Sequence, residues 1–484
     1  MGVLSVIEPK TVWKYFEEIS AIPRGSGNEK EICSYFEEFA IKNSLWYKRD
    51  EYNNILIRKE ASKGYENSDG VILQGHMDMV CEKTALSNHD FNKDPIKIKL
   101  NDDFITADGT TLGADNGIAC AIALAVLEDN SLEHPPIEVL LTSDEEVGMG
   151  GAKNFDCSLI KGKRLINIDS EEEGEIITGC AGGMRAELKV LVKRMAAPLN
   201  AVYCQISISG LKGGHSGSDI HLNRASAIKL AGRLMNELFN SGLCGLCEVT
   251  GGNKDNAIPR ETKITVWCAE KDIKEINEIV LKCEEMFSKE YSPAENGITI
   301  TMDKIDIRPE TVLSADTFGV IKDVINLIPF GVVFMSGKIN GLVESSNNIG
   351  VIRTYKDYVS IISAPRSSVE TRRDLIESKF VSISRLTGSA LEIRGKYPAW
   401  EYREISPLRD IMVETYKDMF GKEMCVNAIH AGLECGILSK GMPQVDMVSI
   451  GPEMYDVHTT EERISVSSVE RTYKYIIEVL KRLK

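Results

Sequence analysis

The chain has 484 residues, 43% of them hydrophobic and 27% charged, which is the composition of an ordinary globular protein. This length exceeds what one hydrophobic core usually serves, so the sequence predicts two or more domains. The net charge of −15 argues against nucleic acids and anionic membrane surfaces as partners, because both attract basic patches.

The sequence shows no pattern typical of export or membrane insertion. Its first residues, MGVLSVIEPK, lack the basic start and long apolar core of a signal peptide. The longest apolar run, roughly 118–127, is too short to span a bilayer. The twelve cysteines follow no framework and indicate reduced, buried thiols. We therefore expect a cytoplasmic protein.

The first predicted elements are two amphipathic helices, followed by short strands. In the second helix, apolar residues 32, 36, 39 and 40 share one face. The runs NNILI, VILQG, IEVLLTS and RLINID lack clean alternation, as expected of strands covered on both faces in a mostly parallel sheet. Between them, DNGIACAIALAVLED predicts a buried helix. Near the end, VDMVSI predicts one more buried strand, and Ser467 with Glu470 predicts the capped start of a final helix.

The middle of the chain has a different pattern. Between about 186 and 395 the strands alternate polar and apolar residues, as in AVYCQISISG and TKITVWCAE, which indicates an antiparallel sheet with helices on one face. Segments 251–280 and 343–376 both run strand end, Asn-rich turn, strand, helix. The sequence leaves open whether this reflects a duplication, which would give two similar subdomains of about 100 residues each.

The predicted fold class is α/β. A mostly parallel-sheet domain would comprise residues 1–185 and 396–484, and residues 186–395 would form an inserted α+β domain.

Acidic residues and histidines follow the predicted strands of the first domain. In open α/β sheets, ligand sites collect outside the carboxyl ends of the strands, so these side chains should converge. Unpaired buried carboxylates are costly, and a divalent ion removes that cost. Imidazole together with carboxylates suits zinc or a similar ion. The set is large enough for two ions if Asp115 bridges them: His76, Asp115, Glu146, Asp169 and His458.

Each of these residues also has an ordinary interpretation. A lone histidine–aspartate pair is usually structural, DEE is usually a solvated turn, and Asp115 before a helix can be an N-cap. Their occurrence together at corresponding strand ends favours the metal site.

The sequence resembles the aminoacyl-histidine (Xaa-His, carnosine-type) dipeptidases, within a larger family of di-zinc exopeptidases and deacylases. The matching motifs extend over nearly the whole chain: IPRGSGNE, GHMDMV, DGTTLGADNGIA, LLTSDEEVGMGGA, INIDSEEEGEI, GLKGGHSGSDIH, HAGLECG and GPEMYDVHTTEE. The resemblance implies a metal-dependent dipeptidase with two zinc ions per chain, in which residues 186–395 form a lid.

The resemblance also implies the role of each residue at the metal centre. His76, Asp115 and Asp169 would hold one ion, and Asp115, Glu146 and His458 the other. Asp78 would fix the tautomer of His76, and a cis peptide would follow Asp115. Glu145, adjacent to a ligand but free itself, would be the general base that takes a proton from the attacking water.

The predicted substrate contacts come from four residues in other segments of the chain. By resemblance, His215 would donate to the developing oxyanion, with Asn256 beside it. Arg366 would pair with the free carboxylate of a dipeptide. Glu434 would pair with the free amine of the substrate, or be a surface residue.

Several alternatives stay open at this point. An N-acyl amino acid deacylase would share every metal residue, and a catalytically silent binding protein is a more distant alternative. The sequence does not fix the preferred dipeptide side chains, the choice among Zn²⁺, Co²⁺ and Mn²⁺, or whether the chain acts as a monomer or a homodimer.

Overall fold

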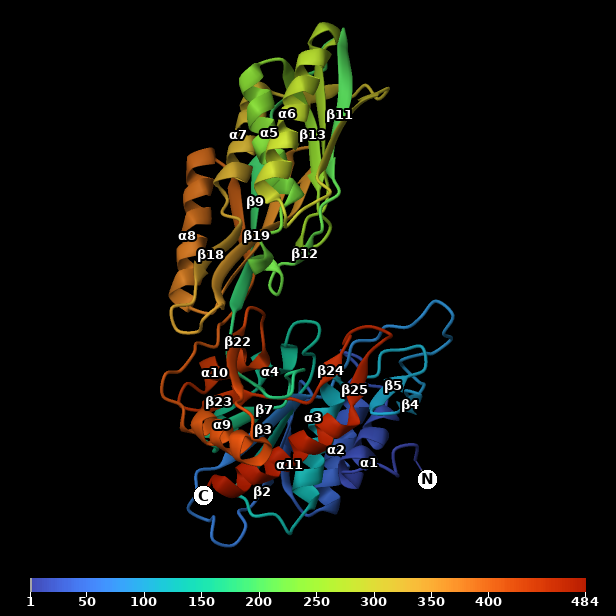
Figure 1. The fold of residues 1–484 in the computed structure, drawn as a ribbon, viewed down its shortest axis with the longest axis vertical. Coiled ribbons are helices and arrows are strands. Elements are labelled where there is room, and N and C mark those ends of the chain that lie inside the picture. The colour runs from blue at the N-terminus through green and yellow to red at the C-terminus, as the bar shows by residue number, and fades with distance from the viewer. Residues whose placement is uncertain (1) are drawn as a thin grey trace. The chain divides into compact units, whose positions relative to one another are not determined.

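The computed structural model describes residues 2–484, which form two compact units (Figure 1). The first unit extends to Cys180 and also includes Tyr402–Ala428 and Leu433–Lys484. The second unit consists of Ala181–Glu401 and Ile429–Gly432. Among residues 2–484, no helix combines the length and the hydropathy needed to cross a membrane.

The first unit is built on an eight-stranded sheet. Its four central strands, β6, β3, β7 and β23, run parallel, as predicted for a mostly parallel sheet. The segment NNILI forms a buried strand of this sheet, as predicted, and its strand β2 pairs antiparallel with β6. In spatial order the strands are β1 (Trp46–Arg49), β2 (Ile55–Lys59), β6 (Ile137–Thr142), β3 (Val71–His76), β7 (Arg164–Asn167), β23 (Asp446–Ser449), β8 (Glu175–Cys180) and β22 (Cys425–Ile429).

Both faces of this sheet are covered, which explains why its strands are apolar without alternation. Val71 and Leu73 of β3 face a large core that five helices share, whereas Ile72 between them is buried on the opposite face. The five helices are α1 (Lys10–Ser20), α2 (Lys30–Lys42), α3 (Ala114–Glu128), α9 (Pro407–Phe420) and α11 (Val466–Arg482). Helix α10 (Glu434–Gly441) contacts β8, β23 and the short helix α4 (Gly150–Asn154), and a 3-10 turn covers Cys157–Leu159.

A small antiparallel sheet joins two segments of the first unit that are far apart in sequence. Strand β25 (Arg463–Ser465) pairs with β5 (Phe104–Ala107), so residues 454–465 lie beside residues 98–107. The other two strands are β4 (Ile98–Asn101) and β24 (Met454–Tyr455). This sheet anchors the loop that carries His458.

The predicted start of the last helix was wrong by two residues. Ser465, not Ser467, is the N-cap of α11, and its side chain accepts a hydrogen bond from the backbone N–H of Ser468. Both Ser465 and Ser467 donate their hydroxyl groups to Asp103, at 2.7 and 2.8 Å. Serines at 465, 467 and 468 are all suitable N-caps, so the sequence alone does not fix which one caps the helix.

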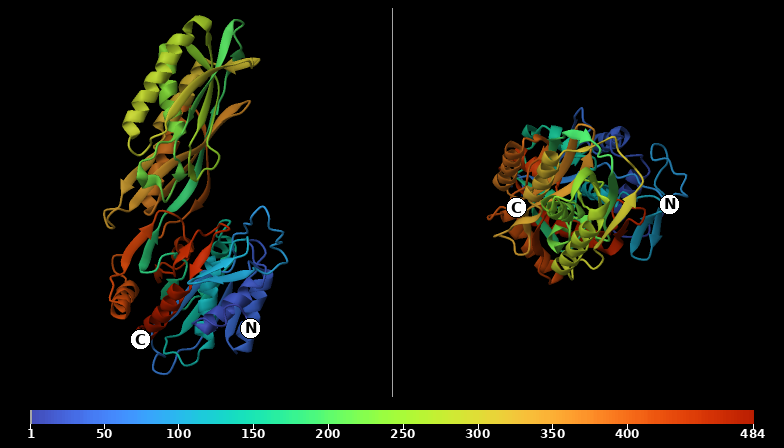
Figure 2. Two further views of the ribbon diagram at one scale, coloured as in Figure 1. Left: turned by 45° about the vertical axis from the view of Figure 1, so that its right-hand side comes forward. Right: turned by 90° about the horizontal axis from the view of Figure 1, so that it is seen from above.

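The second unit contains a nine-stranded sheet in which the pairings are antiparallel. Its helices α5 (Ala227–Ser241), α6 (Ile273–Tyr291), α7 (Ala315–Leu327) and α8 (Glu370–Thr387) share one core with one face of the sheet, as Figure 2 shows. The strands are β16 (Thr299–Ile305), β11 (Ala201–Ser209), β15 (Thr262–Ala269), β13 (Cys244–Gly251), β19 (Val343–Thr354), β20 (Tyr358–Ser367), β9 (Gly182–Leu191) and β21 (Ala390–Tyr397), with β18 (Gly331–Met335) beside β19.

This sheet divides into two halves of the same topology. In the first half the chain order is β11, α5, β13, β15, α6, β16, and in the second it is β9, α7, β19, β20, α8, β21. Both halves have the spatial strand order of a βαββαβ unit, and a short pairing of β13 with β19 joins them. The two segments whose sequences suggested a repeat occupy equivalent places, which supports the duplication.

Shorter elements complete the second unit. They are the pair β10 (Arg194–Ala196) and β17 (Thr311–Leu313), the pair β12 (Gly214–His215) and β14 (Ala257–Ile258), and 3-10 turns at Ile220–Leu222 and Glu270–Asp272.

Candidate metal centre and active site

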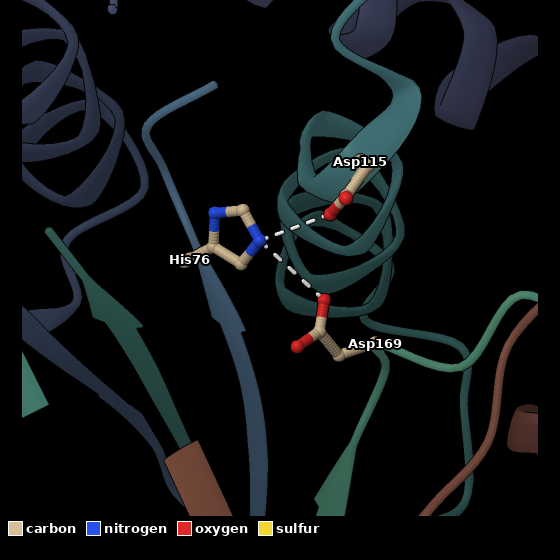
Figure 3. A group of neighbouring side chains, drawn as sticks. All are labelled: His76, Asp115 and Asp169. Carbon is tan, nitrogen blue, oxygen red and sulfur yellow. Dashed lines mark hydrogen bonds and ion pairs between the residues drawn. The ribbon is translucent and has the colours of Figure 1, made fainter. Parts of the chain in front are cut away.

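The first group of converging side chains lies at the carboxyl ends of β3 and β7. His76 is the last residue of β3, Asp169 follows β7, and Asp115 lies at the start of α3 (Figure 3). The Nε2 atom of His76 is 3.0 Å from Oδ1 of Asp115 and 3.5 Å from Oδ1 of Asp169. One nitrogen therefore faces two carboxylates, an arrangement that a cation at their centre would satisfy.

A second group shares Asp115. The Nε2 atom of His458 is 3.0 Å from Oδ2 of Asp115 and 3.0 Å from Oε2 of Glu146. His458 has a φ of +63°, an uncommon conformation for a non-glycine residue that is often found at functional sites. The two oxygens of Asp115 thus face two different imidazoles, which is the geometry expected of a bridging ligand.

The local backbone at Asp115 departs from a regular helix. Asp115 and Asn116 have non-helical φ/ψ angles, and the peptide bond between them is cis, as the family resemblance implied. The Asn116 amide accepts from the N–H of His76 at 3.1 Å and donates to the carbonyl of Ile168 at 2.7 Å, so it ties the ends of β3 and β7 to α3. The alternative that Asp115 is an N-cap is wrong, because Gly113 occupies the N-cap position and the side-chain oxygens of Asp115 face His76 and His458.

Asp78 is fully buried behind the first group. Its carboxylate lies 3.3 Å from Nδ1 of His76 and accepts from the hydroxyl of Ser26 at 2.8 Å. It also accepts from the backbone N–H groups of Glu145 and Glu146, at 3.1 and 3.2 Å. Asp78 therefore orients His76 and also fixes the turn that carries the two glutamates.

The electrostatics of the two groups suit a bound cation. Burial alone would raise the pKa of Asp115, yet His458 and His76 hold it well below its usual range. Hydrogen bonds to Asp115 and Glu146 raise the pKa of His458 to about 11. Burial raises the pKa of Asp169 to about 6. In the metal-free protein, protons on the histidines offset the charge of the carboxylates.

The donor set fits divalent metal ions. The ligand atoms within each of the two groups lie within 4.8 Å of one another, close to the separation allowed by bonds of about 2.0–2.2 Å to a shared zinc ion. In addition, Oε1 of Glu146 is buried without a hydrogen-bond partner among residues 2–484. An unsatisfied buried carboxylate oxygen is costly, and coordination to an ion would satisfy it.

Glu145 lies next to these groups without being required by either. A carboxylate oxygen of Glu145 forms a third potential set with His76 and Glu146. Burial, followed by the charges of Asp169 and Glu434, raises the pKa of Glu145 well above its usual range, whereas His76 opposes the shift. A carboxylate with a raised pKa beside a metal centre is suited to accept a proton at neutral pH.

The structure decides between the two interpretations of Glu434. Its side chain is fully buried, so the surface alternative is wrong. Oε2 accepts from Nε2 of Gln74 and from the hydroxyl of Thr142, both at 2.6 Å, and burial raises the pKa of Glu434 to about 7. Asn167 donates to Gln74 at 2.6 Å. Sequence reasoning missed this network, although polar residues inside buried strands were a visible signal.

A cavity of about 790 Å³ opens beside Glu146. It is lined by residues 25, 26, 28, 79–83, 88–92, 146 and 147, with Asn28, Glu82 and His89 among its polar side chains. Sequence reasoning did not single out the loop 79–92.

The second unit brings His215 and Asn256 together. Both line a cavity of about 720 Å³. Strand β12, which carries His215, pairs with β14, which begins directly after Asn256. Nδ1 of His215 accepts from the N–H groups of Gly217 and Ser218, at 3.3 and 3.2 Å. The remaining proton therefore lies on Nε2, which is then a hydrogen-bond donor. Burial, followed by the charge of Arg366, lowers the pKa of His215 and keeps it neutral.

Arg366 lies on β20 near two histidines. Its Nη1 donates to the hydroxyl of Tyr397 at 3.1 Å, and its Nε is buried without a partner among residues 2–484. His430 hydrogen-bonds Ser346 at 2.6 Å. Burial lowers the pKa of His430 to about 3, and Arg366 contributes to the shift, so His430 is neutral.

Comparison with known proteins gives extensive matches. The family model for peptidase family M20/M25/M40 matches residues 72–482. The cytosol non-specific dipeptidase of Escherichia coli (strain K12) is 38% identical over 485 residues, covering 100% of this chain and 99% of that protein.

Solved structures agree with this match. The aminoacylhistidine dipeptidase from Vibrio alginolyticus is 35% identical, with a TM-score of 0.93, and the match covers 100% of this chain and 98% of that one. A tripeptidase from Staphylococcus aureus shares the fold at 16% identity, with a TM-score of 0.60 and coverage of 100% and 99%. From the family match and from the identity over its whole length, the chain belongs to peptidase family M20/M25/M40.

Proposed function

We propose that this protein is a dipeptidase that uses two divalent metal ions. His76, Asp115 and Asp169 would hold one ion, and Asp115, Glu146 and His458 the other. The observation that carries the proposal is the position of Asp115, whose two oxygens each lie 3.0 Å from a different imidazole nitrogen. Mixed imidazole and carboxylate ligands favour zinc, with cobalt or manganese as substitutes.

When bound, the ions would polarise the peptide carbonyl and increase the acidity of the attacking water. Glu145 would accept a proton from that water and deliver it to the leaving amine. Its raised pKa and its place beside both His76 and Glu146 support this role. Asp78 would act through His76, by holding its ring orientation and tautomer.

The proposed substrate contacts follow from the chemistry of each residue. Glu434 is close enough to His76 and Asp169 for their charges to affect its pKa, and its Oε1 is buried without a partner among the described residues. This oxygen would pair with the free amine of a dipeptide. In the second unit, Nε2 of His215 would donate to the oxyanion, Asn256 would assist, and Arg366 would bind the free carboxylate.

The substrate class is inferred from the two full-length relatives, which are named as a non-specific dipeptidase and an aminoacylhistidine dipeptidase. We infer that Xaa-His dipeptides such as carnosine are among the substrates, and that the enzyme is cytosolic. The alternative, an N-acyl amino acid deacylase, would not require a partner for the substrate amine.

The test is a product-release assay with the zinc-loaded protein, with and without a chelator. The substrates are carnosine, Gly-His, Leu-Leu, a tripeptide and an N-acetylated amino acid. We expect chelator-sensitive cleavage of the dipeptides alone. Cleavage of only the acetylated substrate would reassign the enzyme to the deacylases, and no cleavage of any substrate by protein with two bound ions would support a silent binding protein.

A further inference from the structure

Two buried charged residues, Arg24 and Glu462, lie beside the metal centre without belonging to any of its potential ligand sets. Arg24 is 1% exposed and Glu462 is 3% exposed. Burying a charge is costly unless hydrogen bonds compensate for the lost water. The bonds that both residues form therefore indicate what they do.

Glu462 binds four successive backbone N–H groups. Its Oε2 accepts from Leu112 and Gly113, at 2.7 and 3.0 Å, and its Oε1 accepts from Ala114 and Asp115, at 2.8 and 3.3 Å. The first N–H groups of a helix have no partner within the helix, and an ionised carboxylate offers about four acceptor positions. Glu462 thus satisfies the start of α3 up to and including Asp115 itself.

Arg24 binds carbonyl groups of the neighbouring segments. Its Nη1 donates to the carbonyls of Met77 and Asp78, at 3.0 and 3.1 Å, and its Nη2 donates to the carbonyl of Gly113. Gly113 has a φ of +70°, and a Cβ atom there would lie 2.5 Å from Nη2 of Arg24. Arg24 therefore joins the segment after His76 to the segment before Asp115, at a position that requires glycine.

Glu462 also connects Asp115 to His458. The two residues at positions 458 and 462 belong to one turn, in which the N–H of Glu462 donates to the carbonyl of Thr459 at 3.3 Å and the Thr459 hydroxyl donates to the carbonyl of Asp456 at 2.7 Å. The position of the His458 turn relative to the bridging aspartate thus depends on Glu462.

We propose that Glu462 and Arg24 are positioning residues that together hold the backbone of Asp115 so that its two oxygens face both metal positions. Glu462 acts on the N–H groups and on the His458 turn, and Arg24 acts on the carbonyls and on the His76 segment. This inference rests on the proposed two-metal function. It predicts that the two residues affect metal affinity although neither is a ligand.

The test compares Glu462→Gln with Glu461→Gln, an adjacent exposed glutamate. Glutamine at 462 keeps the size of the side chain, but its NH₂ group would face N–H donors and leave two of them unsatisfied. We expect Glu462→Gln to weaken binding of the ion held by Asp115, Glu146 and His458 by about 10–100-fold, the range for residues that orient ligands. The measurement is a zinc titration of the metal-free protein against a competing chelator. The Glu461→Gln control should bind both ions as the unmodified protein does.

Arg24→Lys provides an independent variant, because a lysine keeps the charge but cannot reproduce the planar fork that reaches three carbonyls. We again expect a loss of about 10–100-fold in zinc affinity. Circular dichroism and the Tm of the metal-free variants establish that they are folded. If Glu462→Gln does not fold, Glu462→Asp replaces it, since its shorter side chain keeps the charge but not the reach.

The outcomes separate this inference from the proposed function. Folded variants that bind both ions with unchanged affinity would overturn it. A lower Tm with unchanged zinc affinity would also overturn it, because that result describes a purely structural role. If the unmodified protein itself does not bind two ions, that result contradicts the proposed two-metal function, on which this inference rests.

Discussion

The two units of this protein organise their functional side chains in different ways. In the first unit, parallel strands bring the residues that follow them to one edge of the sheet, so His76 and Asp169 meet although 92 residues separate them. In the second unit the sheet is antiparallel and has no common carboxyl edge. There, His215 and Asn256 are brought together by the short β12–β14 pairing outside that sheet.

The difference also appears in the charges. The first unit concentrates buried carboxylates around two histidines whose pKa values are raised. The second unit combines neutral histidines with Arg366, and the pKa values of both His215 and His430 are lowered. Metal binding should therefore depend on the first unit alone, whereas the second unit should affect only turnover and substrate binding.

The strongest test of this division of roles between the two units is Asp115→Ala. Because both groups share Asp115, its removal should abolish binding of both ions and reduce hydrolysis to the background rate. Metal content by elemental analysis is the measurement, and Asp306→Ala, at an exposed position in the second unit, is the control. Retention of both ions would show that Asp115 does not bridge them.

Glu145→Gln should separate metal binding from catalysis within the first unit. We expect both ions to be retained and kcat to fall by about 10²–10⁴, the usual contribution of a general base. Steady-state kinetics on a dipeptide and metal analysis of the same sample provide the measurement. Near-normal turnover would exclude Glu145 as the base.

His215→Gln should distinguish the role of the second unit from that of the first. We expect kcat to fall by about 10²–10³, as for loss of one oxyanion donor, while zinc affinity stays unchanged. His221→Gln is the matched control, since His221 is an exposed histidine in the same loop region. A change in zinc affinity would contradict the division of roles between the units.

The pH dependence of zinc affinity should show the smallest effect. The pKa of His458 is raised to about 11 in the metal-free protein, so this histidine holds a proton at neutral pH that zinc must displace. Its protonated form stabilises the folded metal-free chain below the unfolded-state pKa of about 6.5, and this contribution is lost as the pH rises through the folded-state pKa. Below a pH of about 6, Asp169 also takes up a proton.

Affinity should therefore fall on acidification, by about tenfold per pH unit for each proton displaced. Zinc titrations at several pH values in buffers of different ionisation enthalpy would give both the slope and the number of protons. An affinity independent of pH between 6 and 8 would contradict the protonated state of His458.

Much of the architecture could be predicted from local patterns. The strands at VILQG, IEVLLTS, RLINID and VDMVSI are present, because runs of β-branched residues are stable when buried on both faces. The direction of β2 was not predictable, since an apolar strand has the same pattern in either orientation. The cap of α11 was also missed, because Ser465 and Ser467 are chemically alike and both donate to Asp103. Only the hydrogen bond from the N–H of Ser468 to Ser465 distinguishes them.

The sequence by itself determined which residues gather at the strand ends. A histidine or carboxylate directly after a buried parallel strand has one edge of the sheet available, so His76, Glu146 and Asp169 had to converge. Only the tertiary structure decided which charged residues are buried. Glu434 could be exposed or buried on its motif alone, and in its buried position it accepts hydrogen bonds from Gln74 and Thr142 on two different strands.

The tertiary structure also decided how the bridging aspartate is held. Arg24 and Glu462 are 438 positions apart, and no local pattern relates them to Gly113 or Asp115. Their contribution consists of hydrogen bonds to backbone groups, which every residue carries. Backbone partners leave no side-chain signal in a sequence, so only the folded chain identifies them.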